Sequence, residues 1–98
     1  MNDKLRPLAE IDRVIHEPSR LMIVAMLTGV KQADFLYLQN ETAMNKGTLS
    51  SHLSRLEQAG YVTIEKTYRG KVPRTVCRLS VAGRAAFRRY RKALSSTL

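Results

Sequence analysis

Apolar residues recur at helical spacing in the middle of the chain. Leu49, Leu53 and Leu56 fall at positions i, i+4 and i+7, which places them on one side of a helix that buries a single stripe. Asn45 is a suitable N-cap because its side-chain oxygen can accept hydrogen bonds from the first free backbone amides. Gly60 stands where a helix commonly ends. The pattern therefore predicts a helix over residues 45–60.

The opposite face of this predicted helix differs from an ordinary solvated surface. Its side chains are short or hydrogen-bonding, and Arg55 is the one charged residue among them. A solvated helix face would more often carry Glu and Lys. Small polar side chains with one arginine suit contact with another surface, such as the major groove of DNA. We interpret this helix as a DNA-recognition helix, whose outer face consists of Gly47, Thr48, Ser51, Ser54, Arg55 and Gln58.

Three further helices are predicted before it. The polar stretch Met1–Pro7 is expected to be frayed, and apolar residues at helical spacing predict a short amphipathic helix over residues 8–15. A second helix, over residues 18–28, begins at a proline and is apolar all round, as central helices are. Asp34 is expected to cap a third helix that continues to about Thr42, with its apolar residues Phe35 and Leu38 facing the core.

Only Ala43 and Met44 link this third helix to the recognition helix. Two helices joined so tightly, the second with a face that fits a groove, form a helix-turn-helix. Any antiparallel pair of helices would show the same spacing, so the pattern alone does not distinguish the two.

After Gly60 the apolar period changes from helical to alternating. Residues 62–65 predict a strand with one buried face, and residues 75–79 predict a returning strand with Cys77 and Leu79 inward. The turn between them is expected over residues 68–74. Three cations gather there and repel one another, which suggests an anionic partner such as phosphate or a narrow minor groove. A solvated hairpin tip fits these cations equally well when they are taken alone. After a helix-turn-helix, such a hairpin is expected to be a wing with the cations Arg69, Lys71 and Arg74.

The last segment, residues 80–98, predicts an amphipathic helix that Ser80 can cap. One stripe is apolar and the remainder is rich in arginine. The stripe exceeds what a small core needs, so we favour a homodimer helix over packing within the chain, while binding to an anionic membrane is a weaker alternative. The residues expected at the dimer interface are Phe87, Tyr90, Leu94 and Leu98.

The amino-acid composition limits the classes of partner that the chain can bind. The 98 residues, expected to form a single domain over 1–98, include 17 Lys and Arg against 8 Asp and Glu, a formal net charge of +9. Such a surplus favours nucleic acid, because neutralised phosphates release condensed counterions. Cys77 is the single cysteine, which excludes an intrachain disulfide and a thiolate metal cage and fits a reducing cytoplasm. No apolar run reaches the roughly 20 residues of a membrane span.

Three blocks of sequence extend this interpretation. The segment HEPSRLMIVAML resembles the helix that precedes the helix-turn-helix in the ArsR and MarR groups of winged-helix regulators. The segment NKGTLSSHLSRLEQAGYVTIEK resembles their recognition helix and first wing strand. The segment YRGKVPRTVCRLSVAGRAAFRRY is similar to the wing and final helix of the small MarR-like winged-helix DNA-binding family. The similarity runs from Leu8 to Leu94, with the blocks in the order that the family has.

The resemblance implies a mainly α fold with a small β-hairpin, a winged helix-turn-helix with a C-terminal dimerisation helix. It also implies a homodimeric, sequence-specific regulator, usually a repressor, that binds double-stranded DNA. Two recognition helices would meet half-sites roughly 34 Å apart in a palindromic operator. The residues expected to contact DNA are Asn45, Lys46, Gly47, Thr48, Ser50, Ser51, His52 and Arg55 of the recognition helix and Arg69, Lys71 and Arg74 of the wing. Thr48, Ser51 and Arg55 would contact base edges. Lys46 and the cations of the wing would contact phosphate or the minor groove.

Other functions remain open at this stage. A winged helix that binds RNA or protein without selecting a DNA sequence would share the fold and the charge. A redox sensor would need a reactive thiol at Cys77, but the inward phase of Cys77 favours a small core residue. We expect no cofactor, no metal and no catalysis, since His16 and His52 are far apart and neither has a visible nucleophile or ligand partner.

Overall fold

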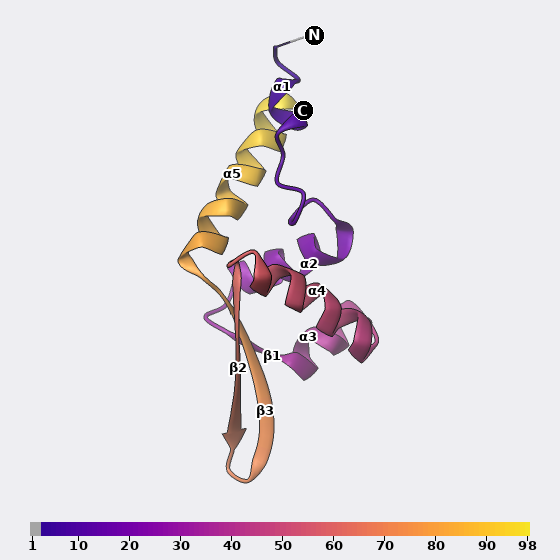
Figure 1. Cartoon of the computed structure of the whole chain (residues 1–98), viewed down its shortest axis with the longest axis vertical. Coiled ribbons are helices and arrows are strands. Elements are labelled where there is room, and N and C mark those ends of the chain that lie inside the picture. The colour runs from indigo at the N-terminus through magenta and orange to yellow at the C-terminus, as the bar shows by residue number, and fades with distance from the viewer. Residues whose placement is uncertain (1–2) are drawn as a thin grey trace.

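Helices make up most of the structure, and one long hairpin projects from them (Figure 1). The computed structural model describes residues 3–98. The sheet is antiparallel with strand order β1-β3-β2. This arrangement confirms the mainly α winged helix-turn-helix, although the short strand β1 was not predicted. Within residues 3–98 the helices are α1 (Arg6–Ala9), α2 (Pro18–Thr28), α3 (Phe35–Thr42), α4 (Lys46–Gln58) and α5 (Val81–Thr97), and the strands are β1 (Ala33–Asp34), β2 (Val62–Arg69) and β3 (Val72–Leu79).

The predicted starts of the three longest helices are confirmed by their capping contacts. Asn45 precedes α4, and its side-chain oxygen accepts from the backbone amide of Thr48 at 2.8 Å. Ser80 precedes α5 and accepts from the amide of Gly83 at 2.9 Å. Each cap satisfies an amide that the helix itself leaves free. Helix α2 begins at Pro18 as predicted, and its side-chain cap is the carboxylate of Glu17.

The prediction for the N-terminal segment is wrong in extent. Helix α1 ends at Ala9 and residues 11–15 are not helical. The cause is Asp12, whose carboxylate accepts from the amides of Val14 at 2.9 Å and Ile15 at 3.2 Å. Such local bonds compete with helical ones and turn the chain. The frayed segment was predicted over residues 1–7; its first two residues lie outside the described part, and residues 6–7 belong to α1.

The wing is longer than predicted, since residues 68–74 are not a turn. The strands continue until Arg69 pairs with Val72, and the connection is only Gly70 and Lys71. Gly70 has a φ of 63°, which a two-residue hairpin turn requires and glycine adopts without strain. Pro73 lies within β3 because β1 pairs only with residues 76–77, so this part of the strand has an open edge that tolerates proline.

The core lies where α2, α4, α5 and the base of the hairpin meet. It is built from apolar side chains that are at most 9% exposed, and among the described residues no polar or charged residue is buried to that extent. The hairpin and the far end of α5 project from it in opposite directions (Figure 1). The molecule therefore measures 57 × 25 × 21 Å, and its radius of gyration is 14.9 Å. A compact chain of this length would have a radius of gyration of about 13 Å. The buried residues include Ile23, Val24, Leu27, Leu38, Leu49, Leu53, Leu56, Cys77, Ala86 and Tyr90.

Within residues 3–98, no helix is both long enough and apolar enough to cross a bilayer.

The junction between α5 and β2 allows a mutational test of the packing. A methyl group at Gly83 would overlap the backbone carbonyl of Tyr61, which cannot move without displacing β2. We expect Gly83→Ala to lower the free energy of unfolding by about 1–3 kcal/mol, as overpacking of a rigid contact does. Thermal or urea unfolding measures the change.

Gly47→Ala is the matched control. A methyl group there would lie 3.6 Å from the Asn45 side chain, an ordinary contact. Alanine also favours a helix by up to about 1 kcal/mol over glycine, so this variant should be at least as stable as the original chain. Equal losses at the two glycines would contradict the close approach of α5 to β2.

Candidate nucleic-acid interface

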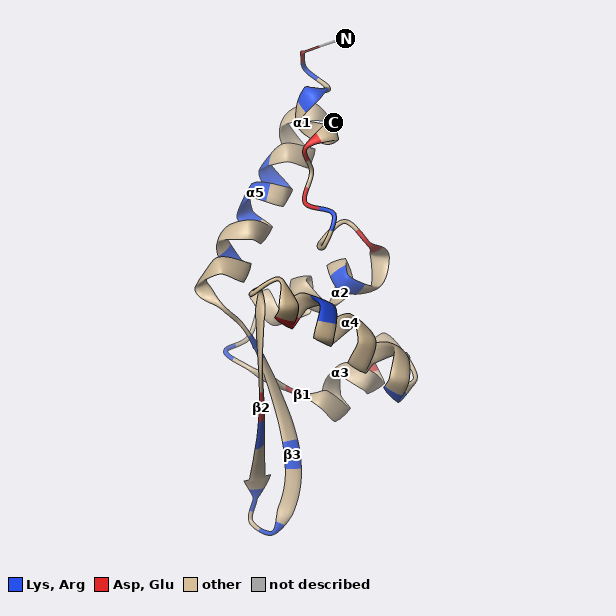
Figure 2. Cartoon of the chain, in the orientation of Figure 1, with Lys and Arg blue, Asp and Glu red and all other residues tan. Residues whose placement is uncertain are grey.

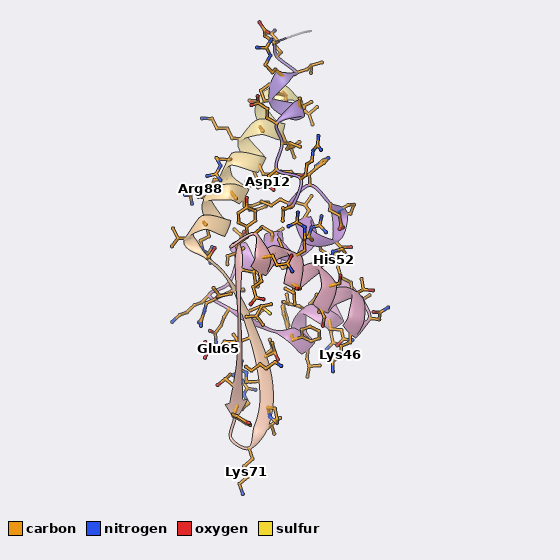
Figure 3. The ribbon with its side chains drawn as sticks, viewed as in Figure 1. Asp12, Lys46, His52, Glu65, Lys71 and Arg88 are labelled. Carbon is orange, nitrogen blue, oxygen red and sulfur yellow. The ribbon has the colours of Figure 1, made fainter. Side chains whose placement is uncertain are left out.

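Helix α4 presents the polar face that its sequence predicts. The leucine stripe is buried and at most 2% exposed, which fixes the rotation of the helix about its axis. Ala43, with a left-handed φ of 57°, makes the tight link from α3. Lys46 stands at the N-terminal end of α4 (Figure 3). The predicted contact residues Asn45, Lys46, Gly47, Thr48, Ser50, Ser51 and Arg55 are all exposed.

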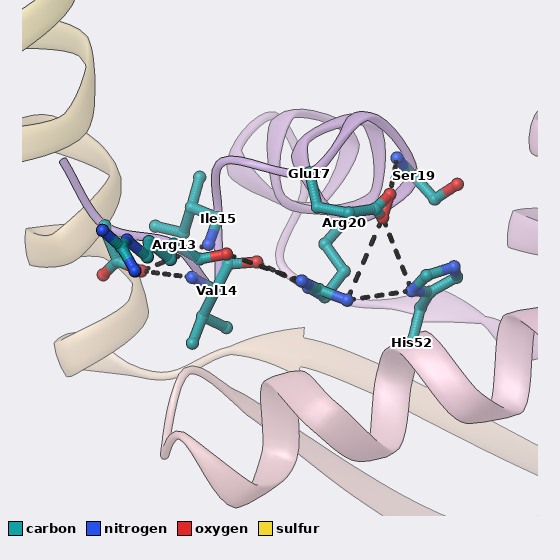
Figure 4. Close-up of polar contacts among 8 residues, drawn as sticks. Arg13, Val14, Ile15, Glu17, Ser19, Arg20 and His52 are labelled. Atoms are coloured by element: carbon teal, nitrogen blue, oxygen red, sulfur yellow. Dashed lines mark hydrogen bonds and ion pairs between the residues drawn. The ribbon is translucent and has the colours of Figure 1, made fainter. Parts of the chain in front are cut away.

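His52 differs from the other predicted contact residues of α4. Its ring is turned from the outer face toward the start of α2, where it meets Glu17 and Arg20 (Figure 4). The His52 side chain is 21% exposed. The structure therefore places His52 between α4 and α2, which the sequence pattern did not show.

The wing cations also occupy different surroundings. Arg69 and Lys71 are exposed at the end of the hairpin, and Lys71 projects from its tip (Figure 3). Arg74 is half-buried and forms an ion pair with Asp34, to which its Nε donates at 3.0 Å. Asp34 occupies the N-cap position of α3, but its side chain makes no capping bond there, so its predicted role as a side-chain cap is wrong. Its carboxylate instead fixes the wing to β1.

A groove of about 540 Å³ lies between the wing and the helix-turn-helix. Lys46 reaches it from α4, Phe35 and Leu36 from α3, and Lys66 and Tyr68 from β2. Lys66 and Tyr68 continue the face of β2 that buries Val62 and Ile64, because alternate residues of a strand share a face. Sequence analysis missed both as site residues; the signal was this alternation carried beyond the core.

Positive charge borders the groove on both sides, and the blue of Figure 2 marks it on the hairpin and at the start of α4. Lys46 and Lys66 form no ion pair in the described part of the chain. An extended anion can lie between them, with the outer face of α4 on one side and the hairpin on the other.

Comparison with known proteins agrees with this geometry. The family model described as a winged helix DNA-binding domain matches residues 19–98. The chain belongs to this winged helix DNA-binding domain family. The match includes all of α3, α4, the wing and α5. The first three of these line the groove, and α4 carries the exposed polar face.

Relatives and solved structures support the same assignment. The chain is 32% identical over 79 residues to the uncharacterized protein MJ0432 of Methanocaldococcus jannaschii, covering 80% of this chain and 85% of that protein. The structure of a transcriptional regulator homologue from Pyrococcus horikoshii has a TM-score of 0.87 and 29% identity, and the match covers 93% of this chain and 92% of that one. A MarR-family transcriptional regulator from Silicibacter pomeroyi shares the fold, with a TM-score of 0.65, 24% identity, and coverage of 97% and 62%.

The four residues expected at a dimer interface are not equivalent in this winged helix. Phe87 and Tyr90 are 9% and 3% exposed, and Tyr90 also forms a hydrogen bond with His16 at 2.9 Å, so both already pack within the chain. Leu94 is half-buried against the core. Leu98 is 88% exposed and retains nearly all of its apolar surface.

Cys77 lies on β3, and its side chain is fully buried in the core of the winged helix. Burial, with the negative charges of Glu57 and Asp34, raises the pKa of its thiol to about 11. The reactive form of cysteine is the thiolate, so this environment opposes a redox role. In residues 3–98 no three His, Cys, Asp or Glu side chains are grouped as a metal site would require.

The buried thiol gives a measurable expectation. At pH 8 a thiol reagent should modify Cys77 on the order of 100-fold more slowly in the native protein than in denaturant, because the thiolate fraction is small and the sulfur is inaccessible. Timed alkylation followed by mass spectrometry measures both rates. Comparable rates would instead indicate an accessible, reactive thiol.

Proposed function

We propose that this winged helix is a sequence-specific transcriptional regulator that binds double-stranded DNA as a homodimer and represses by occupying a promoter. The observation that carries the proposal is the exposed small polar face of α4 beside a cationic groove and a projecting wing. An α-helix fits the major groove, and a hairpin beside it can contact phosphate or the adjacent minor groove. The similar structure from Pyrococcus horikoshii is that of a transcriptional regulator homologue, which supports the same function.

The residues divide by the chemistry that they offer to DNA. Arg55 is the charged side chain of the outer face, and arginine to guanine is the commonest specific pairing. Thr48 and Ser51 add hydroxyl groups that can accept or donate at base edges. Lys46 and Lys66 border the groove, where the phosphate backbone would pass between α4 and the wing. Arg69 and Lys71 extend this contact to the hairpin tip.

The homodimer is supported by apolar surface at the end of the molecule remote from the wing. α1 packs against α5 there, and Leu5 and Leu98 are 48% and 88% exposed. A second copy would bury these side chains and place two α4 helices on one duplex. Their spacing would match a palindromic operator with half-sites about 34 Å apart. Such a regulator would act in the cytoplasm of a prokaryotic cell, where its DNA is.

DNA binding can be divided into base and phosphate contributions. Arg55→Ala should relax preference at one base position, at a cost of about 1–3 kcal/mol to the preferred sequence. Lys71→Ala should weaken binding to specific and random duplexes alike. It should also reduce the slope of log affinity against log salt concentration by about 1, because one phosphate contact is lost. Selection from random duplex DNA, then titrations at several salt concentrations, measures both effects. If the chain preferred structured RNA, or selected no motif, the proposed function would be wrong.

A double variant tests how the ion pair between Arg74 and Asp34 contributes to DNA affinity. Arg74→Ala should weaken all duplexes alike, partly because it leaves the carboxylate of Asp34 unpaired beside the groove. Adding Asp34→Ala should restore part of the lost affinity, since it removes that negative charge. Additive losses in the double variant would show that Arg74 contacts phosphate independently of Asp34.

Self-association has its own test. Leu98→Glu should weaken the dimer by roughly tenfold or more, because burial of a leucine contributes about 1.5–3 kcal/mol and a buried carboxylate costs more. Val81→Glu is the matched control, since Val81 is 87% exposed at the opposite end of α5. Sedimentation over a range of concentrations gives both dissociation constants. A monomeric parent chain, or equal effects of the two variants, would contradict the proposed interface.

A further inference from the structure

Three polar side chains connect the recognition helix to the start of α2. Nδ1 of His52, on α4, lies 3.3 Å from a terminal nitrogen of Arg20 and 3.6 Å from Oε2 of Glu17 (Figure 4). The same nitrogen of Arg20 lies 3.9 Å from that oxygen. Each side chain is between 17% and 26% exposed. We call Glu17, Arg20 and His52 the α2–α4 cluster.

Glu17 and Arg20 are both held in place by backbone groups. Oε1 of Glu17 accepts from the amide of Ser19 at 2.5 Å and caps α2. Arg20 donates through Nε to the carbonyl of Val14 at 2.6 Å and through a terminal nitrogen to that of Arg13 at 3.5 Å. The cluster therefore joins α4 to a rigid turn and helix start.

One atom of the cluster lacks a hydrogen bond. Oε2 of Glu17 is buried and has no donor within hydrogen-bonding distance in the described structure. Burial raises the pKa of Glu17, but the Ser19 amide and the charges of His52 and Arg20 outweigh it, so the net shift is downward. Glu17 is thus ionised at neutral pH, and its buried oxygen is left with ion-pair contacts alone. A buried charged acceptor without a donor is costly.

The contacts of His52 define two arrangements of the cluster. Arginine only donates, so Nδ1 must accept from Arg20 when the ring is neutral, which places the proton on Nε2. A protonated ring carries a hydrogen on Nδ1 as well, so it can no longer accept from Arg20 and can instead donate to Oε2 of Glu17, 3.6 Å away. Protonation would then satisfy the buried oxygen and draw α4 toward α2.

We propose that His52 is a positioning residue whose protonation closes the α2–α4 cluster and strengthens operator binding as the pH falls. This inference rests on the proposed DNA-binding function. The closed arrangement holds α4 in one position on α2, and the added positive charge lies on the helix that meets DNA. Histidine changes charge between about pH 5 and 8, so the effect lies in that range.

Other charges near α4 do not compete for the ring. β2 also packs against α4 and carries Glu65 and Lys66. Glu65 is bound by Arg78 at 2.6 Å and, within residues 3–98, forms no ion pair with His52, while Lys66 lines the groove beside the wing. The charged groups facing the ring are therefore Glu17 and Arg20 of α2.

The free protein tests the cluster without DNA. Nitrogen-15 spectra of the imidazole at pH 8 should show the proton of His52 on Nε2. At pH 6 the proton on Nδ1 of His52 should be hydrogen-bonded to Glu17, and Glu17→Gln should weaken this bond because the protonated ring loses its anionic partner. A proton on Nδ1 at pH 8, or an Nδ1 signal at pH 6 that Glu17→Gln leaves unchanged, would overturn the assignment whatever the DNA affinity is.

The second test measures affinity for the selected operator between pH 8 and pH 6 at constant ionic strength. The parent chain should bind roughly fivefold more tightly at pH 6. His52→Gln and Glu17→Gln should each remove most of this gain, and circular dichroism verifies that both variants fold.

His16→Gln is the matched control for the affinity test. His16 is the only other histidine of the chain, and its ring is bonded to Tyr90 rather than to α4. The variant should keep the pH dependence. A gain that survives His52→Gln but disappears in His16→Gln would overturn the proposal, as would a parent chain whose operator affinity does not change with pH. Failure to bind any duplex would instead refute the proposed function. The spectra of the free protein would still test the arrangement of the α2–α4 cluster.

Discussion

Burial of one leucine stripe on α4 is the interaction on which the rest of the structure depends. Leu49, Leu53 and Leu56 pack into the core that α2 and β2 complete. Full burial of each contributes about 1.5–3 kcal/mol, a large part of the net stability of a small domain. Because the stripe occupies one side of the helix, the opposite side must face outward. The same packing therefore holds the fold together and sets the direction of the candidate DNA-contacting residues.

Acidic residues serve this arrangement by fixing elements around α4. Asp34 holds Arg74 and with it the wing, and Glu65 holds Arg78 across the hairpin. Each pair offsets the charge of one cation near the candidate interface. The cations that form no ion pair within the described part of the chain include Lys46, Arg55, Lys66, Arg69 and Lys71, and these border the groove or lie on the exposed faces of α4 and the wing. Carboxylates thus set the geometry, and unpaired cations form the candidate interface.

Sequence alone predicts the elements whose signals are local. Periodicity and caps define α2, α4 and α5 because helical bonds and capping bonds join residues within four positions. The predicted N-terminal helix was too long because Asp12 competes locally for backbone amides, a choice that composition does not decide. The predicted turn of the wing was too long because Gly70 and Pro73 both indicate loops, although the open edge of β3 accepts the proline.

The site was predictable to the extent that it depends on helical phase. The exposed polar face of α4 follows directly from its leucine stripe. The position of His52 does not, because its partner Arg20 lies 32 positions earlier in the chain. The same holds for Asp34, whose N-cap position was identified but whose side chain pairs with Arg74, 40 positions away. Contacts over such separations depend on the packed fold and leave no periodic signal in the sequence.

The positive charge of α5 bears on affinity for polyanions but not on selection of a base sequence. This helix carries five of the 17 Lys and Arg residues and none of the 8 Asp and Glu. Arg84 donates to the carbonyls of Thr28 and Val30 at the end of α2, but Arg88 and Lys92 are exposed, four positions apart, and repel each other. Their field attracts any polyanion and is screened over about 8–10 Å, so it cannot select a base sequence. In the proposed regulator, selection would therefore come from the outer face of α4, where Arg55 and a few hydroxyl groups can enter a groove.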